Sequence, residues 1–200
     1  MEMANLIRNT QCKGKIFNFI LTSPIGDIKI TSCLDGLHSV MPCAEDDSNF
    51  SPDERRPVLL KPGQKDGNLV DCDPANKCFI WLKNYFTDRV ASSDLPPLCN
   101  SVVKTDSFCA HALQLLPKAA PMGTTVTYKD LARLCGNEKA CRAAGHAMAT
   151  NPVALLIPCH RVITSSGGPG NYAHGKKNST KIWLLKFEQG PLQGTCKHLR

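Results

Sequence analysis

The sequence predicts an α/β (α+β) protein of two domains, first a small antiparallel sheet with a helix, then a helical domain of helix-turn-helix type. Two hundred residues are enough for two small domains with buried cores. Short β-rich runs broken by turns fill the first part, and amphipathic helical runs fill the second. The charge divides at the same point, with a net −1 over residues 1–105 and +8 over residues 106–200. We therefore expect domains at residues 1–105 and 106–200.

The basic second half leaves two interpretations open, a surface that faces a polyanion and a solvated lysine-rich surface. No apolar run is long enough to span a membrane. The opening MEMANLIRNTQCKGK lacks the apolar region of a signal peptide. We therefore expect an intracellular protein with no membrane partner.

The first domain begins with strands separated by tight turns. The run IFNFILTSPIGDIKITSCLDGLHSV, residues 16–40, breaks at the turn sequences SPIG and DG. Residues 41–71 are polar and rich in Pro, Gly and Asp, which predicts a long loop.

A helix over residues 73–86 follows the loop. Asp73 is placed to cap it, and Pro74 fits the first helical position. Its predicted apolar face consists of Cys78, Phe79, Leu82 and Phe86. The run SSDLPPLCNS then reads as the linker that ends the first domain.

The second domain opens with a helical run, DSFCAHALQLLPKA, whose residues Phe108, Ala112 and Leu115 are in phase. In TYKDLARLCG, Thr127 fits the N-cap, Asp130 the capping-box position and Gly136 the C-terminal stop.

The next run, NEKACRAAGHAMA, predicts a second helix capped by Asn137, which completes a helix-turn-helix pattern. Its side chains are small, so it can approach another backbone closely. Two explanations remain open. The helix packs closely against another helix inside the domain, or it inserts into a nucleic-acid groove, where Lys139 and Arg142 would supply charge.

Eleven cysteines are many for this length, and an intracellular setting disfavours disulfides. Free cysteine behaves as a small apolar residue, so burial is the default expectation for six of them. These are Cys43, Cys72, Cys78, Cys109, Cys135 and Cys196.

The run NPVALLIPCHRV predicts a buried strand that leads into a Cys159-His160 pair. A thiolate is the reactive form of cysteine, but neighbours in a strand point to opposite faces. His160 can therefore assist Cys159 only through a local bend or a bridging water. In the last helical run, STKIWLLKFEQG, Glu188 is an acid that would orient His160, although an exposed helix-surface glutamate is the more frequent case.

The glycine-rich run SSGGPGNYAHG lies between the thiol and this helix. Glycines let a backbone come near a ligand, and Tyr172 suits stacking on a flat ring. A flexible surface hairpin explains the run as well. From the residues alone, a catalytic and a structural Cys159 remain equally open.

In its surroundings PCHRV is more specific. With NPVALLI before it and SSGGPGNY after it, the sequence resembles the O6-alkylguanine-DNA alkyltransferase family. The resemblance extends through TYKDLARLCGNEKACRAAGHAMATNP to WLLKFEQG, and TSPIGDIKITSCLDGLH resembles the first domain of the vertebrate type. It implies a ribonuclease-H-like first domain and a winged-helix second domain. A cysteine protease is disfavoured, because those sites place the base histidine far from the cysteine in sequence.

The resemblance implies DNA repair by direct reversal. The family flips an O6-alkylguanine (less well, an O4-alkylthymine) out of double-stranded DNA and moves its alkyl group irreversibly to the cysteine. Each molecule acts once, without a diffusible cofactor. We accordingly expect a nuclear, single-turnover methyltransferase that acts as a monomer. Two alternatives are a damage-binding protein that does not repair and a helix-turn-helix regulator that binds one undamaged sequence.

The family's functional residues carry over by position. The resemblance implies that Cys159 is the nucleophile, that His160 deprotonates it through water, and that Glu188 holds His160. It also implies that Arg142 fills the gap left by the flipped base and that Tyr128 contacts both phosphate and base. The other residues assigned to DNA are Thr127, Ala140, Cys141, Ala143, Gly145, Met148 and Asn151, of which Asn151 also serves the active site. The residues assigned to the guanine pocket are Met148, Val162, Asn171, Tyr172 and Ala173.

The sequence departs from the family at several of these positions. Ala173 replaces a serine, His174 a glycine and Ala154 a proline near the pocket, and GKKNSTK carries two extra residues. On the recognition helix, His146 stands where the family has a glycine and Ala149 where an arginine is common, and loss of the arginine is expected to weaken a phosphate contact.

Some family members carry a structural zinc in the first domain, held by two cysteines and two histidines. Cys33 and His38 match this pattern directly, Cys12 matches nearby, and Cys99 replaces the second histidine. Three cysteines and one histidine are an accepted tetrahedral zinc set. Unrelated buried thiols and imidazoles are the alternative.

Overall fold

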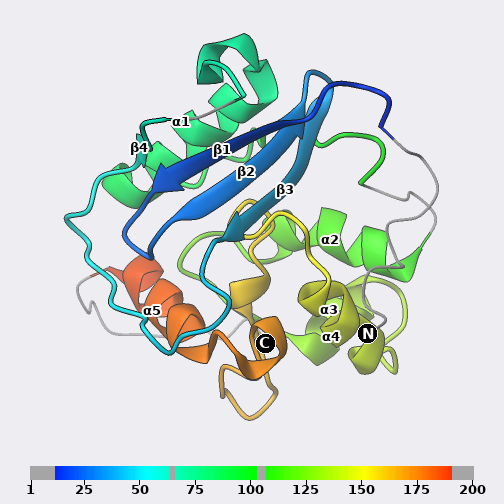
Figure 1. Cartoon of the computed structure of the whole chain (residues 1–200). Coiled ribbons are helices and arrows are strands. Elements are labelled where there is room, and N and C mark those ends of the chain that lie inside the picture. The colour runs from blue at the N-terminus through cyan, green and yellow to red at the C-terminus, as the bar shows by residue number, and fades with distance from the viewer. Residues whose placement is uncertain (1–11, 64–65, 103–106, 191–200) are drawn as a thin grey trace.

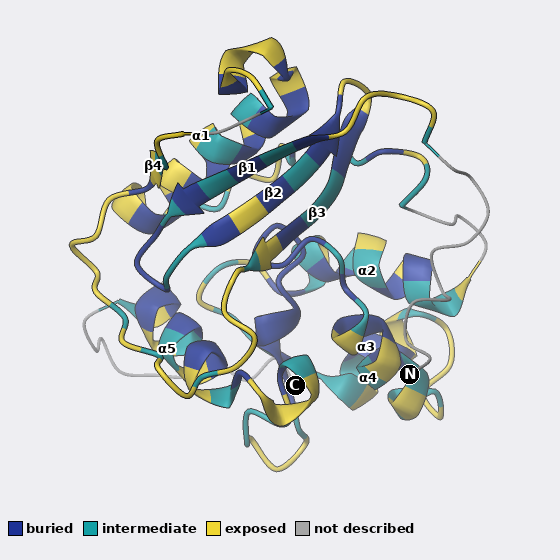
Figure 2. Ribbon diagram, viewed as in Figure 1, coloured by how far each residue is buried: buried dark blue, intermediate teal, exposed yellow. Residues whose placement is uncertain are grey.

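The computed structural model describes residues 12–63, 66–102 and 107–190 (Figure 1). A four-stranded antiparallel sheet forms one half of the molecule, and helices α2–α5 gather in the other half (Figure 1). The predicted fold class is confirmed. One cluster of buried residues runs through both halves, so they share a continuous core (Figure 2).

The sheet has the strand order β3-β2-β1-β4. Its strands are β1 (Phe17–Thr22), β2 (Ile28–Cys33), β3 (Gly36–Pro42) and the short β4 (Leu59–Leu60). Alternate residues of β1 are buried, as period-two strands with one covered face require. Phe19 pairs with Ile30, which pairs in turn with Val40, and all three are fully buried. The predicted strands and both turns are confirmed.

Helix α1 (Asp73–Asp88) packs against the sheet (Figure 1). Its N-cap is Cys72 rather than Asp73, which is the first helical residue, so the predicted cap was one residue late. Of the predicted apolar face, Cys78, Leu82 and Phe86 are buried. Tyr85, on the same helix, is fully buried as well.

The predicted loop over residues 41–71 also contains the end of β3, β4 and a 3-10 turn, Leu69–Asp71. Within it, Asp47 reaches the start of the last helix, α5 (Asn178–Gln189). Its carboxylate accepts from the Thr180 backbone N–H at 3.0 Å and from the Thr180 hydroxyl at 2.5 Å. The Lys177 ammonium donates to the Ala44 carbonyl. The loop therefore fastens the sheet domain to the helix that carries Glu188.

The helical half consists of α2 (Phe108–Ala119), α3 (Tyr128–Leu134), α4 (Cys141–Ala149) and α5. Strand β5 (Val126–Thr127) pairs in parallel with β6 (Val162–Ile163). The most buried residues of α2 are Ala112 and Leu116. Ala112 was predicted to face the core, whereas Leu116 takes the place predicted for its neighbour Leu115. Thr127 accepts from the Asp130 backbone N–H at 3.0 Å and caps α3, as predicted.

The second helix of the pair begins later than predicted. Asn137 caps a separate turn, where its side chain accepts from the Lys139 backbone N–H, and α4 starts only at Cys141. Lys139 therefore precedes the helix. Gly136 adopts a φ of 85°, which confirms it as the stop of α3.

Residues 151–158 are not a strand, contrary to the prediction. They form turns with isolated bridges, Val40 to Val153 and Ala154 to Ile157, and lead into a 3-10 turn at Cys159–Arg161. Burial alone produced the strand-like pattern, because nearly the whole segment is covered by both halves of the molecule. The non-glycine Leu155 has a φ of 72°, a conformation a strand excludes.

The cysteine expectation holds only in part. Cys72 and Cys78 are buried, but Cys109 and Cys135 are intermediate and Cys43 is exposed. Cys43 follows β3 in the polar loop, which explains its exposure. Cys196 lies outside the described residues.

The linker runs along the outer edge of the sheet. Leu37 donates its backbone N–H to the Pro97 carbonyl, and the Cys99 N–H donates to the Leu37 carbonyl. A Cβ at Gly36 would lie 2.4 Å from the Cys99 nitrogen, so only glycine permits this approach. The predicted boundary at residue 105 lies outside the described residues and stays a prediction.

No helix in the described ranges has the length and apolar character needed to cross a membrane.

Candidate active site

Cys159 begins the 3-10 turn that follows Pro158, and it is 5% exposed. The Asn151 amide holds it: Nδ2 donates to Sγ at 3.1 Å and to the Ile157 carbonyl at 2.8 Å. Asn151 Oδ1 accepts from the Val153 backbone N–H. One side chain at the end of α4 thus fixes both the turn and the thiol. The Tyr172 hydroxyl lies 4.0 Å from Sγ.

His160 and Glu188 are in direct contact. His160 Nε2 lies 2.7 Å from Glu188 Oε1, and both side chains are buried. The contact places the imidazole proton on Nε2, where it donates to the carboxylate. The other nitrogen, Nδ1, is buried and has no hydrogen-bond partner among the described residues. Glu188 therefore orients the imidazole of His160, and its Nδ1 is available to accept a proton.

Two further side chains donate to Glu188. Arg161 Nε donates to Oε2 at 2.8 Å and Nη2 donates to Oε1 at 2.9 Å, while Nη1 donates to the Ala120 carbonyl. The Tyr85 hydroxyl donates to Oε1 at 2.6 Å. Glu188, on α5, therefore accepts hydrogen bonds from both α1 and the 3-10 turn.

The electrostatics keep the resting site neutral at the thiol and the imidazole. Burial raises the pKa of Cys159, although the Asn151 amide and the Lys181 ammonium oppose it. Burial lowers the pKa of His160, and Glu188 offsets this only in part. Burial would raise the pKa of Glu188, but His160 and Arg161 outweigh it and hold that pKa well below its usual value. The site therefore holds a thiol, a neutral base and an ionised acid near pH 7.

Sequence reasoning missed Lys181, a fully buried lysine of α5. Its ammonium donates to the Val162 carbonyl at 2.7 Å and lies 5.9 Å from the ring centres of both Tyr128 and Tyr172. Burial lowers its pKa to about 8. Its spacing of seven residues before Glu188 on one helix was the available signal, because such residues share a helix face.

Helix α4 buries one side and exposes another. Ala144, Ala147 and Met148 are buried, whereas Arg142 and His146 are exposed, four residues apart. Partial burial is also found for Thr127, the N-cap of α3, for Tyr128, its first residue, and for four small residues of the α4 region, Ala140, Cys141, Ala143 and Gly145. The exposed side is therefore basic and low in bulk.

The residues assigned to the base pocket lie on three segments: Met148 on α4, Val162 on β6, and the run 171–173 before α5. Tyr172 is 8% exposed and Met148 7%, whereas Asn171 is exposed and Ala173 intermediate. Val162 is fully buried and reaches the site through its carbonyl. Ala173 and His174 have φ angles of 47° and 58°, a left-handed conformation that costs non-glycine residues energy.

Cys12, Cys33, His38 and Cys99 come together on the sheet domain. Their ligand atoms all lie within 4.8 Å of one another. His38 Nε2 is buried and has no hydrogen-bond partner among the described residues. A buried imidazole nitrogen surrounded by three thiols has the chemistry of a zinc ligand.

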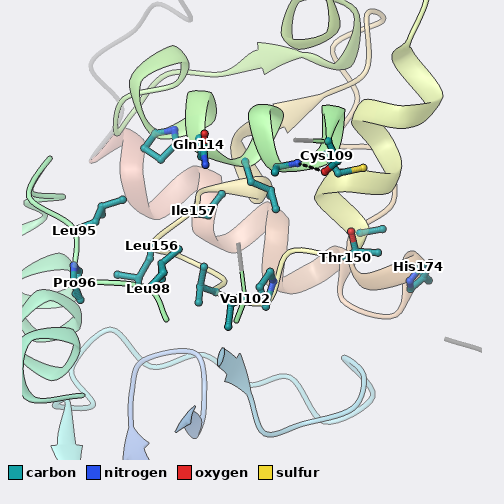
Figure 3. A pocket seen from close by; sticks show the side chains of 17 residues that line it. Leu95, Pro96, Leu98, Val102, Cys109, Gln114, Thr150, Leu156, Ile157 and His174 are labelled. Atoms are coloured by element: carbon teal, nitrogen blue, oxygen red, sulfur yellow. Dashed lines mark hydrogen bonds between the residues drawn. The ribbon is translucent and has the colours of Figure 1, made fainter. Parts of the chain in front are cut away.

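A separate cavity of about 470 Å³ lies between the linker and α2 (Figure 3). Its lining is mostly apolar and includes Leu98, Leu156 and Ile157. Cys159 does not line it, so this cavity is distinct from the thiol environment.

Comparison with known proteins identifies relatives along nearly the whole described chain. Residues 16–97 match the model of the "6-O-methylguanine DNA methyltransferase, ribonuclease-like domain", and residues 108–190 match that of the corresponding DNA binding domain. The methylated-DNA–protein-cysteine methyltransferase of Rattus norvegicus is 40% identical over 182 residues, which is 90% of this chain and 84% of that protein. The Homo sapiens protein of that name is 36% identical over 84% of this chain and 78% of its own length.

An archaeal relative of the same name, from Methanosarcina acetivorans, is 44% identical over 88% of this chain and 97% of its own. Among solved structures, Mycobacterium tuberculosis OGT in complex with DNA superposes with a TM-score of 0.63 at 26% identity, covering 85% of this chain and 91% of that one.

Proposed function

Because this chain belongs to the 6-O-methylguanine DNA methyltransferase family, it repairs alkylated DNA by direct reversal, and we propose that Cys159 is the thiol that accepts the alkyl group. The methyltransferase names of its relatives do not favour a damage-binding protein without repair activity or a sequence-specific regulator. The observation that carries the assignment is that a buried Cys159, held by the Asn151 amide, directly precedes His160, which is oriented by Glu188. These side chains supply a nucleophile, a base and an orienting acid.

The proposed reaction moves one proton and one alkyl carbon. The Cys159 thiol gives its proton, through a water, to His160 Nδ1, and Glu188 stabilises the resulting imidazolium. The Cys159 sulfur attacks the alkyl carbon, a carbon–sulfur bond forms, and the bond from that carbon to guanine O6 breaks. The electron pair stays with the base, which takes up a proton from solvent water to become guanine, and the imidazolium returns its proton to water. The thioether is stable, so each molecule reacts once.

Asn151 and Lys181 prepare the sulfur for this step. The Asn151 amide donates to Sγ and fixes its direction, and the Lys181 ammonium favours negative charge there. Both are buried, where a charge interacts more strongly than in water. This surrounding compensates for the burial that otherwise raises the pKa of the thiol.

The exposed side of α4 is proposed to enter the minor groove. Arg142 would occupy the space left by the flipped base, and Tyr128 would contact the phosphate and the base. The small residues of α4 permit close approach to the DNA. His146 and Ala149, also exposed, replace family residues on this side and are expected to change the affinity for DNA.

The Cys12, Cys33, His38 and Cys99 cluster is proposed to hold a structural zinc. Tetrahedral zinc–sulfur bonds of about 2.3 Å place sulfur atoms about 3.8 Å apart, so the cluster needs little movement to close on a metal. Zinc would tie the start of the chain, the β2–β3 pair and the linker together. It would stabilise the first domain and take no part in alkyl transfer.

We further propose that the protein acts in the nucleus, as a monomer, and that its domains divide near residue 105. The binding partner of the protein is the damaged DNA duplex. The nuclear site is tested by imaging the tagged full-length chain in cells. The oligomeric state is tested by light scattering of the free protein.

The test of the site is a titration of purified protein with an excess of duplex carrying one O6-methylguanine. We expect one methyl group transferred per molecule and none for Cys159→Ala, which should still bind the duplex. Transfer that continues in Cys159→Ala would exclude the assigned thiol. Loss of both transfer and binding would identify Cys159 as structural.

A further inference from the structure

Tyr85 is the one polar side chain of the sheet domain that donates to Glu188 among the described residues. Its hydroxyl crosses from α1 to Oε1 of Glu188 at 2.6 Å, between residues 103 positions apart. Tyr85 is fully buried, and its ring stacks on Trp81 at 5.3 Å and packs edge-on against Phe86. The phenol is therefore held in one orientation by the apolar core of the first domain.

Glu188 Oε1 receives more donors than Oε2. Tyr85, His160 and Arg161 all donate to Oε1, whereas Oε2 receives Arg161 alone. The Arg161 fork already fixes the carboxylate at both oxygens. The distinct effect of the Tyr85 hydroxyl is therefore on the charge that Oε1 offers to His160. Each added donor makes a carboxylate oxygen a weaker acceptor for the next one.

We propose that Tyr85 is a positioning residue of the alkyl-transfer site, which acts through Glu188 to limit the positive charge that His160 gains. The proposal rests on the proposed roles of Cys159 and His160. A carboxylate that stabilised the imidazolium too strongly would keep His160 protonated, and a protonated His160 cannot accept the thiol proton. The core of the first domain thereby sets the pH range over which the second domain reacts.

The groups around His160 agree with this role. Burial and the Glu188 charge raise the pKa of Tyr85 well above its usual value, so it remains a donor. The charged or titratable groups that face His160 and Glu188 from the surrounding elements are Tyr85 on α1, Cys159 and Arg161 on the 3-10 turn, Tyr172, and Lys181 on α5. Glu188 is the anion among them, so its strength as an acceptor decides the charge on the imidazole.

The test is Tyr85→Phe, which removes the hydroxyl and keeps the ring. We expect the midpoint of His160 protonation, followed by NMR of labelled imidazole, to rise by about 0.5–1 pH unit. The midpoint of the acidic limb of the pH–rate profile for methyl transfer should move to higher pH by the same amount. At higher pH, where His160 is neutral in both proteins, the rates should converge.

The matched control is Cys78→Ala on the same helix. Cys78 is fully buried, so its truncation disturbs the same core, yet no hydrogen bond joins it to Glu188 among the described residues. We expect this variant to lower the melting temperature and leave the His160 midpoint unchanged. An unchanged midpoint in Tyr85→Phe, or an equal shift in Cys78→Ala, would overturn the proposal. The NMR titration needs no transfer activity, so a protein that failed to repair DNA would contradict the proposed function separately.

Discussion

Replacing Glu188 with glutamine removes the charge at the centre of the site and keeps the shape of the side chain. In the native protein the carboxylate accepts from Tyr85, His160 and Arg161, and it is 8% exposed. Glutamine leaves Arg161 as a buried cation without its partner and turns an amide NH₂ toward one of the donors. Breaking a buried pair in this way costs about 3–5 kcal/mol, or roughly 6–20 °C in melting temperature for a chain of this size.

The effect on stability has a defined dependence on pH. The folded-state pKa of Glu188 is depressed, so its contribution is fully present above the usual value of 4.5 and is lost as the pH falls below it. The stability difference between wild type and Glu188→Gln should therefore be constant near neutral pH and narrow in acid. Denaturant unfolding at several pH values measures it.

The same substitution should slow methyl transfer by at least about 10²-fold, because His160 loses both its orientation and the stabilisation of its charged form. Single-turnover kinetics on a duplex with one O6-methylguanine measures the rate. Glu188→Gln protein with a melting temperature within a degree of wild type and an unchanged rate would refute the reasoning.

Three further predictions concern other parts of the molecule. Arg142→Ala should lower the transfer rate on duplex DNA more than on an isolated modified base, since only duplex requires flipping; equal losses would remove its assigned role. Metal analysis should find one zinc per chain, and Cys99→Ala should lower the metal content and melting temperature while keeping methyl transfer; metal-free native protein would exclude the site. His174→Gly should raise the free energy of unfolding by about 0.5–1 kcal/mol, because glycine relieves the left-handed backbone; denaturant titration with no gain would contradict this.

Local signals predicted the elements that local interactions specify. The three long strands follow from period-two burial and their turns, and α3 follows from the Thr127 cap and the Gly136 stop. The start of α4 was misplaced because Asn137 caps a short turn with the same chemistry that it would use to cap a helix. Local sequence cannot separate these two uses of one side chain.

The segment before Cys159 was misread for a different reason. A run of apolar residues reports burial, and burial on all sides looks the same in a strand and in a packed turn. Leu155 adopts its positive φ only because tertiary packing covers it. The local bend that would be needed between Cys159 and His160 exists as the 3-10 turn.

Contacts between segments that are distant in the sequence limited how much of the site could be predicted. The Glu188 partner of His160 was expected because Glu188 is an acid with apolar neighbours on a basic, amphipathic helix, and the two side chains meet at 2.7 Å. Tyr85 was not expected, because a tyrosine on the apolar face of a helix reads as core and its hydroxyl partner is 103 positions away. Lys181 likewise reads as a solvated lysine on a basic helix, yet it is fully buried.

The most direct test of the central claim is to locate the transferred group. Purified protein is reacted with duplex DNA carrying one isotopically labelled O6-methylguanine, then digested and mapped by mass spectrometry. We predict that the label is found on the Cys159 peptide alone among the eleven cysteines, with unmodified guanine left in the DNA. Label on another cysteine, or a labelled base that remains in tightly bound DNA, would contradict Cys159 as the acceptor.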